Sequence, residues 1–220
     1  MKEDYFGGGR LISQAWEFLD SVSHLRKNRP CNLGADAVRA GEVALLVMDM
    51  QDYFLDETSH SYIPSAGAIV PRIGELQRFF VNNGLPVVLT RHLNDPRNAG
   101  RMACWWRELI TIDNPLSRIT GRLDCEQALV LTKSQYDAFY NTSLEEELRR
   151  RGIKQVVITG VLAHLCCETT ARSAFVRGFD VFFVIDAVAT YNREFHRAAL
   201  LNLSHGFAVP VLTQEILTHQ

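Results

Sequence analysis

The sequence lacks an excess of charge of either sign. Its 220 residues include 23 Lys+Arg and 25 Asp+Glu, which gives a formal net charge of -2 at pH 7. Proteins that bind nucleic acids or anionic membranes usually present a strongly basic field, and this balance provides none. We therefore expect no nucleic-acid partner and no membrane partner. A small-molecule substrate and further protein subunits remain the expected partners.

Long apolar segments are also missing. The first residues, Met1–Tyr5, contain no basic stretch that leads into an apolar run, as a secretion signal would. The longest mostly apolar run, Gln155–Cys167, is too short and too often interrupted to span a bilayer. These absences predict a cytoplasmic protein.

The cysteines lack the spacing of a disulfide scaffold or a zinc site. Their number is odd, two are adjacent, and no CxxC pair occurs. The five are Cys31, Cys104, Cys125, Cys166 and Cys167. Such a set favours a reducing compartment. Because hydrophobic residues make up 47% of the chain, one large domain with a sizeable core is expected.

Six short runs rich in Val, Ile and Leu are present instead. They are Val43–Met48, Pro86–Thr90, Ala128–Thr132, Gln155–Thr159, Val181–Ile185 and Ala208–Thr213. Their hydrophobicity is continuous rather than alternating, which is typical of parallel strands covered on both faces. Segments with a helical period separate most of them. This alternation predicts an α/β fold, a doubly wound three-layer sandwich around an open sheet.

Four helices are predicted between these runs. They lie around Ile69–Phe80, from Thr142 or Ser143 to Gly152, at His164–Arg177 and at Arg193–His205. In the second, Glu145 or Glu146 has the spacing of a capping box. Its acidic and basic blocks have i,i+4 spacing, with the acids first, which predicts a solvated helix face.

Two segments fall outside the alternation. Residues 1–40 are interpreted as an N-terminal extension with a helix at Leu11–Leu25, so the domain proper is expected at 41–220. Gly7–Gly9 in the extension follow no strand, which favours a flexible lead-in over a phosphate-binding loop. Residues 92–127 form a long connection, and connections of that length are often functional. We expect it to act as a lid or as a subunit contact.

Three reactive side chains follow three of the predicted strands. Asp49 ends the first, Lys133 ends the third, and Cys166 begins the helix after the fourth. Ligands of open α/β sheets gather beyond the carboxyl ends of the strands, so these residues are expected to meet at one edge. Each also has an ordinary structural interpretation, as a cap, a surface charge or a packed thiol, but their coincidence favours an active site.

The chemistry of the three residues is complementary. A thiol near a helix N-terminus and an ammonium group has a lowered pKa, so we expect a thiolate on Cys166 near neutral pH. Asp49 can take up a proton and return it to a leaving group, while Lys133 orients both partners. The N–H groups of Leu165 and Cys166 are expected to face a developing oxyanion.

The segments around these residues resemble the isochorismatase-like cysteine hydrolase superfamily. The similarity lies in Val47–Phe54, Leu131–Tyr140 and Gly160–Cys166, and it continues through Thr169–Phe175 and Val184–Ala189. It covers about residues 42–218. The resemblance implies a six-stranded parallel sheet of order 3-2-1-4-5-6 and an Asp49, Lys133 and Cys166 triad. It also implies a cis peptide bond at Val161–Leu162 and a Cys167 side chain that packs away from substrate.

Within the superfamily the sequence resembles two groups of enzymes. Asp49–Phe54 and Ala163–Leu165 are most similar to isochorismatases, which cleave a vinyl ether by protonation from the Asp. Those enzymes carry Gly where this chain has Cys166, and Tyr where it has Leu162. The retained thiol favours hydrolysis of a C–N bond in a small amide or carbamoyl compound through a covalent acyl-enzyme. Isochorismatase chemistry and a non-catalytic binding subunit are the alternatives.

A set of polar and aromatic residues near these segments is predicted to form the substrate pocket. It comprises Gln51, Tyr53, Phe54, Arg91, Trp105, Tyr136 and His164. Arg91, at the end of the second strand, could pair with a substrate carboxylate. Trp105 and Trp106 belong to the long connection, where relatives place residues that close the site or meet another subunit.

No metal and no other cofactor is expected. Nicotinamidases of the superfamily bind a metal through an Asp and His cluster after the first two strands. The candidates here are Asp56, His60, His92 and Asp95, and their spacing does not reproduce that cluster. Because relatives are commonly oligomers, the resemblance implies a homo-oligomer.

Overall fold

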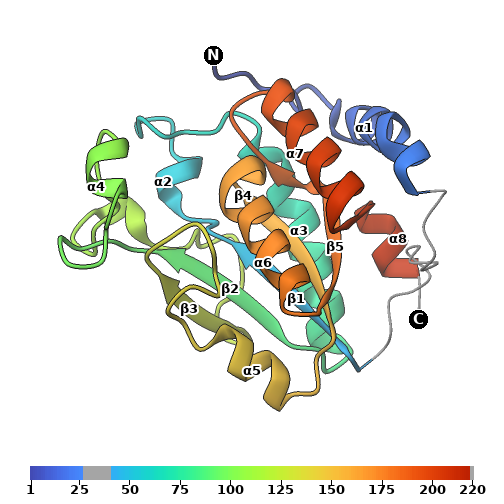
Figure 1. The fold of residues 1–220 in the computed structure, drawn as a ribbon. Coiled ribbons are helices and arrows are strands. Elements are labelled where there is room, and N and C mark those ends of the chain that lie inside the picture. Colours follow the sequence, from blue (N-terminus) through green and yellow to red (C-terminus); the bar gives the residue numbers. More distant parts are fainter. Residues whose placement is uncertain (27–40, 219–220) are drawn as a thin grey trace.

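A computed structural model describes residues 1–26 and 41–218 of the chain. Its centre is a six-stranded parallel sheet of order β3-β2-β1-β4-β5-β6 (Figure 1). The strands are β1 (Val43–Met48), β2 (Val87–His92), β3 (Leu129–Lys133), β4 (Gln155–Val161), β5 (Asp180–Ala189) and β6 (Val209–Val211). The predicted fold class and strand order are therefore confirmed.

Helices cover both faces of this sheet. They are α1 (Leu11–Arg26), α2 (Asp52–Leu55), α3 (Ala66–Asn82), α4 (Met102–Trp105), α5 (Leu144–Arg150), α6 (Glu168–Val176), α7 (Arg193–Gly206) and α8 (Thr213–Thr218), with short turns η2 (Pro115–Ser117) and η3 (Ala163–Cys167). Helices α6 and α7 lie on the face nearer the viewer in Figure 1, and α3 lies behind the sheet. None of the described helices is long and apolar enough to cross a membrane.

The two central strands, β1 and β4, carry the core and set the position of the site. Both are buried along their whole length, as their continuous apolar sequence predicts. Their register pairs Met48 with Gly160. A Cβ atom at Gly160 would overlap the backbone of Met48, and the φ of Gly160 is +103°. Glycine is required here for the carboxyl ends of β1 and β4 to lie this close together.

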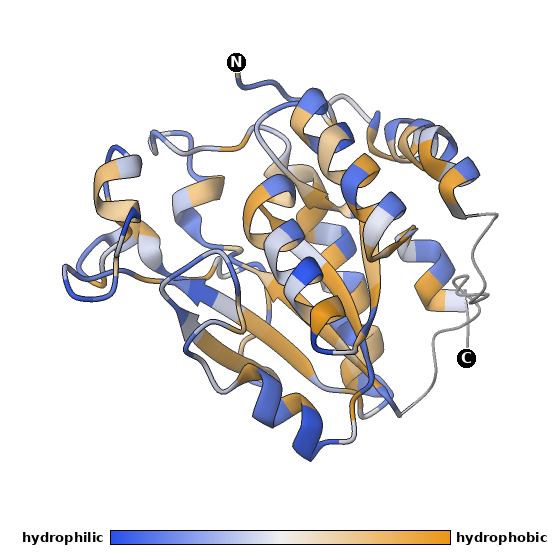
Figure 2. Cartoon of the chain, viewed as in Figure 1, coloured by the Kyte–Doolittle hydropathy of each residue, from blue (hydrophilic) through white to orange (hydrophobic). Residues whose placement is uncertain are grey.

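The distribution of hydropathy matches the layers of the fold. The strands are largely hydrophobic, whereas α5 is hydrophilic along most of its surface (Figure 2). Ion pairs cross this helix face from Arg149 to Glu145 and from Arg150 to Glu147, as the charge blocks indicate. The predicted capping box is wrong: the N-cap residue Ser143 makes no side-chain cap hydrogen bond, and Glu145 pairs with Arg149 and Arg177 instead. Thr142 Oγ1 instead accepts a hydrogen bond from the Leu144 N–H.

The N-terminal residues are part of the packed molecule. Tyr5 and Phe6 are buried, and helix α1 lies beside α7 (Figure 1). Gly8 and Gly9 have positive φ values in the turn that enters α1, so the expected flexible lead-in is an ordered turn. Cys31 falls outside the described residues.

Candidate active site

Asp49 follows the last residue of β1 and is held in a strained conformation. Its φ is +48°, which is uncommon for a residue other than glycine. The Thr90 hydroxyl on β2 donates to Asp49 Oδ1 at 2.6 Å, and the Asp49 N–H donates to the same Thr90 oxygen at 3.0 Å. Residues kept in such conformations are concentrated at functional sites, because the surrounding structure must offset the strain.

Lys133, at the end of β3, reaches across β2 to this carboxylate. Its Nζ lies 2.8 Å from Asp49 Oδ2, and both side chains are almost fully buried. The same Nζ donates to the carbonyl of Gln135 at 2.9 Å. Burial raises the pKa of the Asp49 carboxyl, but Lys133, His92 and the hydrogen bond from Cys166 together lower it below its ordinary value. Burial lowers the pKa of Lys133, but Asp49 and Cys166 together raise it above its ordinary value. The two side chains therefore form a charged pair.

Cys166 lies in η3, the π-helical turn that follows β4. Lys133 Nζ is 3.5 Å from its Sγ, and the thiol hydrogen-bonds to Asp49. Burial raises the pKa of this thiol to about 12, although Lys133 acts in the opposite direction. The expected thiolate is therefore wrong, because burial disfavours the charged sulfur more than Lys133 favours it, and Asp49 raises the pKa further. The resting site holds a neutral thiol against a carboxylate, and we refer to Asp49, Lys133 and Cys166 as the floor triad.

The turn around Cys166 changes the expected oxyanion donors. The Val161–Leu162 peptide bond is cis. The Leu165 N–H donates to the Leu162 carbonyl at 3.0 Å, and the Cys167 N–H donates to the same oxygen at 3.2 Å. Leu165 is thus occupied within the turn and does not offer its N–H to a substrate, contrary to the prediction. The N–H of Cys166 remains a candidate donor.

A pocket that opens to solvent lies over Cys166. Its lining combines aromatic, aliphatic and polar side chains: Tyr53, Phe54, His60, Ser61, His92, Asn94, Met102, Trp106, Glu108, Leu109, Ile110, Tyr136, Leu162, Leu165, Cys166 and Tyr191. Three residues predicted for the pocket, Tyr53, Phe54 and Tyr136, are among them.

Two residues predicted for the pocket, Gln51 and Arg91, instead form hydrogen bonds that hold neighbouring segments in place. Gln51 is buried, where its amide nitrogen donates to the carbonyls of His92 and Ser117 and its oxygen accepts from the His92 N–H. Arg91 donates to the backbone and side-chain oxygens of Ser117. Neighbouring residues of a strand point to opposite faces, so His92 faces the pocket and Arg91 does not.

Two more predicted pocket residues lie outside it. Trp105 on α4 is 76% exposed, and the next residue, Trp106, takes the position in the pocket wall. His164 hydrogen-bonds through Nδ1 to Thr190 Oγ1 at 2.6 Å and stacks on Phe195. These contacts hold the start of η3 in place, and the His164 side chain does not line the pocket.

The outer wall of the pocket was not predicted. His60 and Glu108 come from two separate connections, and they meet at 3.3 Å between His60 Nδ1 and Glu108 Oε1. The Tyr53 hydroxyl donates to the same Glu108 oxygen at 2.7 Å. We refer to His60, Trp106 and Glu108 as the rim. The residues of the rim follow no periodic pattern, so only the unusual length of the 92–127 connection pointed to two of them.

The N-terminal segment supports the rim from outside. Lys2 Nζ donates to the His60 carbonyl at 2.5 Å and lies over the ring of Tyr191. The Glu3 N–H donates to the Tyr191 carbonyl, and the Tyr5 hydroxyl accepts from the Thr190 N–H. The segment therefore ties together two loops that contribute pocket residues.

The residues of the site do not fit a bound metal ion. Ligand atoms of Asp49, His92 and Cys166 lie within 4.8 Å of one another. Lys133 Nζ, however, is 2.8 Å from the Asp49 carboxylate, 3.3 Å from His92 Nδ1 and 3.5 Å from the thiol, so an ammonium group stands where the cation would bind.

The other predicted metal candidates are engaged elsewhere. Asp56 accepts hydrogen bonds from Thr58, and Asp95 accepts them from the N–H groups of Arg97 and Asn98. His60 faces Glu108, as described above. These residues do not converge on a common point.

A thiol, an ammonium group and a carboxylate at the carboxyl edge of a doubly wound sheet define a class of hydrolases. Residues 43–215 match the family model described as "Isochorismatase domain", and the chain belongs to this family. Nicotinamidase 3 from Arabidopsis thaliana is 39% identical over 171 residues, which are 75% of this chain and 82% of that protein. Isochorismatase from Bacillus subtilis is 35% identical over 176 residues, covering 79% of this chain and 56% of that protein.

A solved structure gives the same fold. N-carbamoylsarcosine amidase from Thermoplasma acidophilum aligns with a TM-score of 0.69 and 27% identity, covering 78% of this chain and 96% of that one. The protein is therefore a hydrolase of the isochorismatase family.

Proposed function

We propose that this hydrolase cleaves a C–N bond in a small amide or carbamoyl compound through an acyl-enzyme on Cys166. The observation that carries the proposal is the floor triad. A thiol lies in the pocket lining, and a buried carboxylate and ammonium group both contact it.

The first step uses Asp49 as the base. The thiol is neutral at rest, so its proton passes to the Asp49 carboxylate as the sulfur attacks the substrate carbonyl carbon. The C–S bond forms, and the carbonyl electron pair moves to the oxygen, where the Cys166 N–H can donate. Lys133 stays charged and compensates the negative charge in the site throughout.

The second half of the reaction returns the active site to its resting state, with a neutral thiol on Cys166 and a charged carboxylate on Asp49. The proton on Asp49 passes to the leaving nitrogen as the C–N bond breaks, and ammonia or an amine departs. Water then attacks the thioester carbon and gives one proton to Asp49, which delivers it to the departing sulfur. The balance is one amide and one water consumed, with one carboxylic acid and one amine formed.

Two of the similar proteins support this chemistry. A nicotinamidase and an N-carbamoylsarcosine amidase are, by their names, enzymes that act on an amide and on a carbamoyl group. The aromatic side chains of Tyr53, Trp106 and Tyr136 line the pocket and offer apolar surface to a small ligand. We propose that the ligand of this site is a small compound with an apolar part.

Isochorismatase chemistry is the second candidate, favoured by the 35% identity to the Bacillus subtilis enzyme. In that reaction Asp49 would have to protonate a vinyl ether. Burial raises the pKa of Asp49, but Lys133, His92 and Cys166 together lower it, which disfavours the protonated form that such a step needs. A non-catalytic binding subunit would give no turnover in either assay.

The test compares two products in two variants. Ammonia release from a panel of amides and carbamoyl compounds is measured beside pyruvate release from isochorismate, for the wild type, Cys166→Ala and Asp49→Ala. We expect ammonia release that is lost in both variants. Pyruvate release that survives Cys166→Ala but not Asp49→Ala would instead establish the second candidate.

We also propose that the chain forms a homo-oligomer, with α4 as part of the contact, because Trp105 is largely exposed there. Sedimentation velocity is expected to show a species larger than one chain, and Trp105→Ala to weaken it. A monomer at all concentrations would contradict this.

A further inference from the structure

Glu108 places a carboxylate at the open side of the pocket. Its side chain is 48% exposed and lines the pocket, whereas Cys166 is buried. The Tyr53 hydroxyl and His60 Nδ1 both contact Oε1 of Glu108. Within the described residues, Oε2 makes no hydrogen bond or ion pair. One oxygen is therefore fixed by the protein and the other is left for a ligand.

Apart from the His60 imidazole, which meets Glu108 Oε1 at 3.3 Å, no group of the described lining is placed to balance this charge. Asp49 and Lys133 neutralise each other, and burial lowers the pKa of His92 to about 4, so its ring is uncharged near neutral pH. No Lys or Arg from residues 1–26 or 41–218 lines the pocket. Lys2 meets the rim from outside, where its ammonium group is engaged by the His60 carbonyl and the Tyr191 ring.

We propose that Glu108 makes the pocket selective for small amides that carry a cationic group, and that it rejects those that carry a carboxylate. This inference rests on the proposed C–N hydrolase function and names its substrate class. A cation on the far side of a ring from the amide would lie against Glu108 while the carbonyl meets Cys166. An anionic compound would meet the repulsion of the same carboxylate, and no Lys or Arg of the described lining would offset it.

Three matched compounds test the charge preference: benzamide, 3-(aminomethyl)benzamide as the cation and 3-carbamoylbenzoate as the anion. Ammonia release gives kcat/KM for each with the wild type, and calorimetry gives their affinity for Cys166→Ala. Because Glu108 is half exposed and partly screened, we expect the cation to be preferred over the anion by roughly tenfold.

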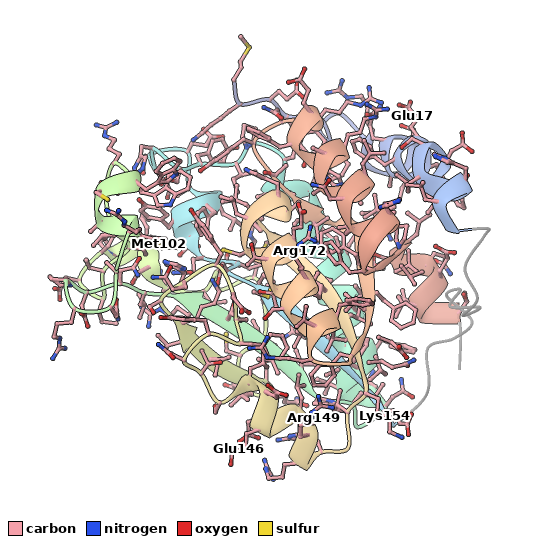
Figure 3. All side chains as sticks on the ribbon, viewed as in Figure 1. Glu17, Met102, Glu146, Arg149, Lys154 and Arg172 are labelled. Carbon is pink, nitrogen blue, oxygen red and sulfur yellow. The ribbon has the colours of Figure 1, made fainter. Side chains whose placement is uncertain are left out.

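Two Glu-to-Gln variants separate the role of Glu108 from surface charge in general. In Glu108→Gln the preference should fall to within about twofold, since the charge is lost while the shape stays similar. Glu146→Gln removes an equivalent charge from α5, far from the pocket residue Met102 in Figure 3, and the preference should stay as in the wild type. A decrease in both variants would overturn the assignment to Glu108.

The two readouts distinguish this inference from the proposed function. If none of the three compounds is hydrolysed but the cation binds most tightly, the charge selectivity stands and the amide chemistry is wrong. Equal affinities, a preference for the anion, or no binding of any compound to Cys166→Ala would overturn the charge selectivity. Hydrolysis of all three at equal kcat/KM would overturn it and leave the amide chemistry intact.

Discussion

The floor triad and the rim of the same pocket are built in opposite ways. Asp49, Lys133 and Cys166 follow three strands of one sheet, are buried, and contact each other directly. The rim, by contrast, comes from two connections, and Glu108 is half exposed. Buried charges interact strongly and tolerate little change, whereas exposed ones are screened. We therefore assign the chemistry to the floor triad and the choice of substrate to the rim.

The largest effect is expected from Lys133→Met, which removes one partner of a buried ion pair. The carboxylate of Asp49 is left without compensation, so we expect a loss of about 3–5 kcal/mol in the free energy of unfolding. Urea denaturation measures it. An unpaired buried carboxyl takes up a proton more readily, so the loss should shrink as the pH is lowered.

The matched control is the double variant Asp49→Asn, Lys133→Met. Both charges are removed there, and most of the lost stability should return although activity does not. Equal stability of Lys133→Met and the wild type at pH 7 would show that the pair is not the buried unit described here, and the contrast with the rim would disappear.

The sequence allowed this floor to be predicted but not the rim. Continuous apolar runs fix where each strand ends, and in a parallel sheet those ends share an edge, so Asp49, Lys133 and Cys166 could be placed together. Arg91 was misplaced because a run buried on both faces does not show which side chains point toward the ligand.

Electrostatic details lay beyond the sequence as well. The pKa of Cys166 depends first on its burial and then on where the Lys133 and Asp49 charges lie around it, and only the three-dimensional structure decides both. The meeting of His60 with Glu108 depends on loop conformations, for which no periodic pattern exists. The contacts of Lys2 with His60 and Tyr191 also depend on loop conformations, so the sequence could not predict them.

The pH dependence of alkylation distinguishes the thiol of the floor triad from an exposed one. Burial raises the pKa of Cys166 to about 12, so its rate of labelling by iodoacetamide should still be rising at pH 10. Peptide mass spectrometry resolves it from Cys104, which is exposed and serves as the internal reference. A plateau for Cys166 near neutral pH would mean that a thiolate is present at rest, and Asp49 would not be needed as the base.

Thr90→Val is expected to have a smaller effect on the floor triad. The substitution keeps the side-chain shape but removes the hydroxyl that donates to Asp49 at 2.6 Å. A hydrogen bond to a buried charge contributes about 1.5–3 kcal/mol, and this loss should appear in urea denaturation together with a lower kcat. Thr159→Val is the matched control, since its hydroxyl donates to the neutral carbonyl of Leu46. An equal decrease in kcat for both variants would argue against a special role for Thr90.

The smallest effect is expected from a substitution in the N-terminal segment, which supports the rim. Tyr5→Phe removes a hydroxyl that accepts from the Thr190 N–H and also hydrogen-bonds to His196 Nδ1, at a cost of about 1–2 kcal/mol in stability. Because Thr190 precedes the pocket residue Tyr191, KM should rise about twofold to threefold while kcat stays unchanged. Steady-state kinetics separates the two, with Tyr62→Phe as a control outside the pocket. A lower kcat with unchanged KM would place this contact with the floor rather than the rim.

The covalent intermediate tests the central claim most directly. Enzyme turning over benzamide is quenched in acid, and its intact mass and peptides are measured. The proposed mechanism predicts a benzoyl group on Cys166, present during turnover and absent once the substrate is consumed. A benzoyl group on another residue, or ammonia release by enzyme whose Cys166 stays unmodified throughout, would contradict it.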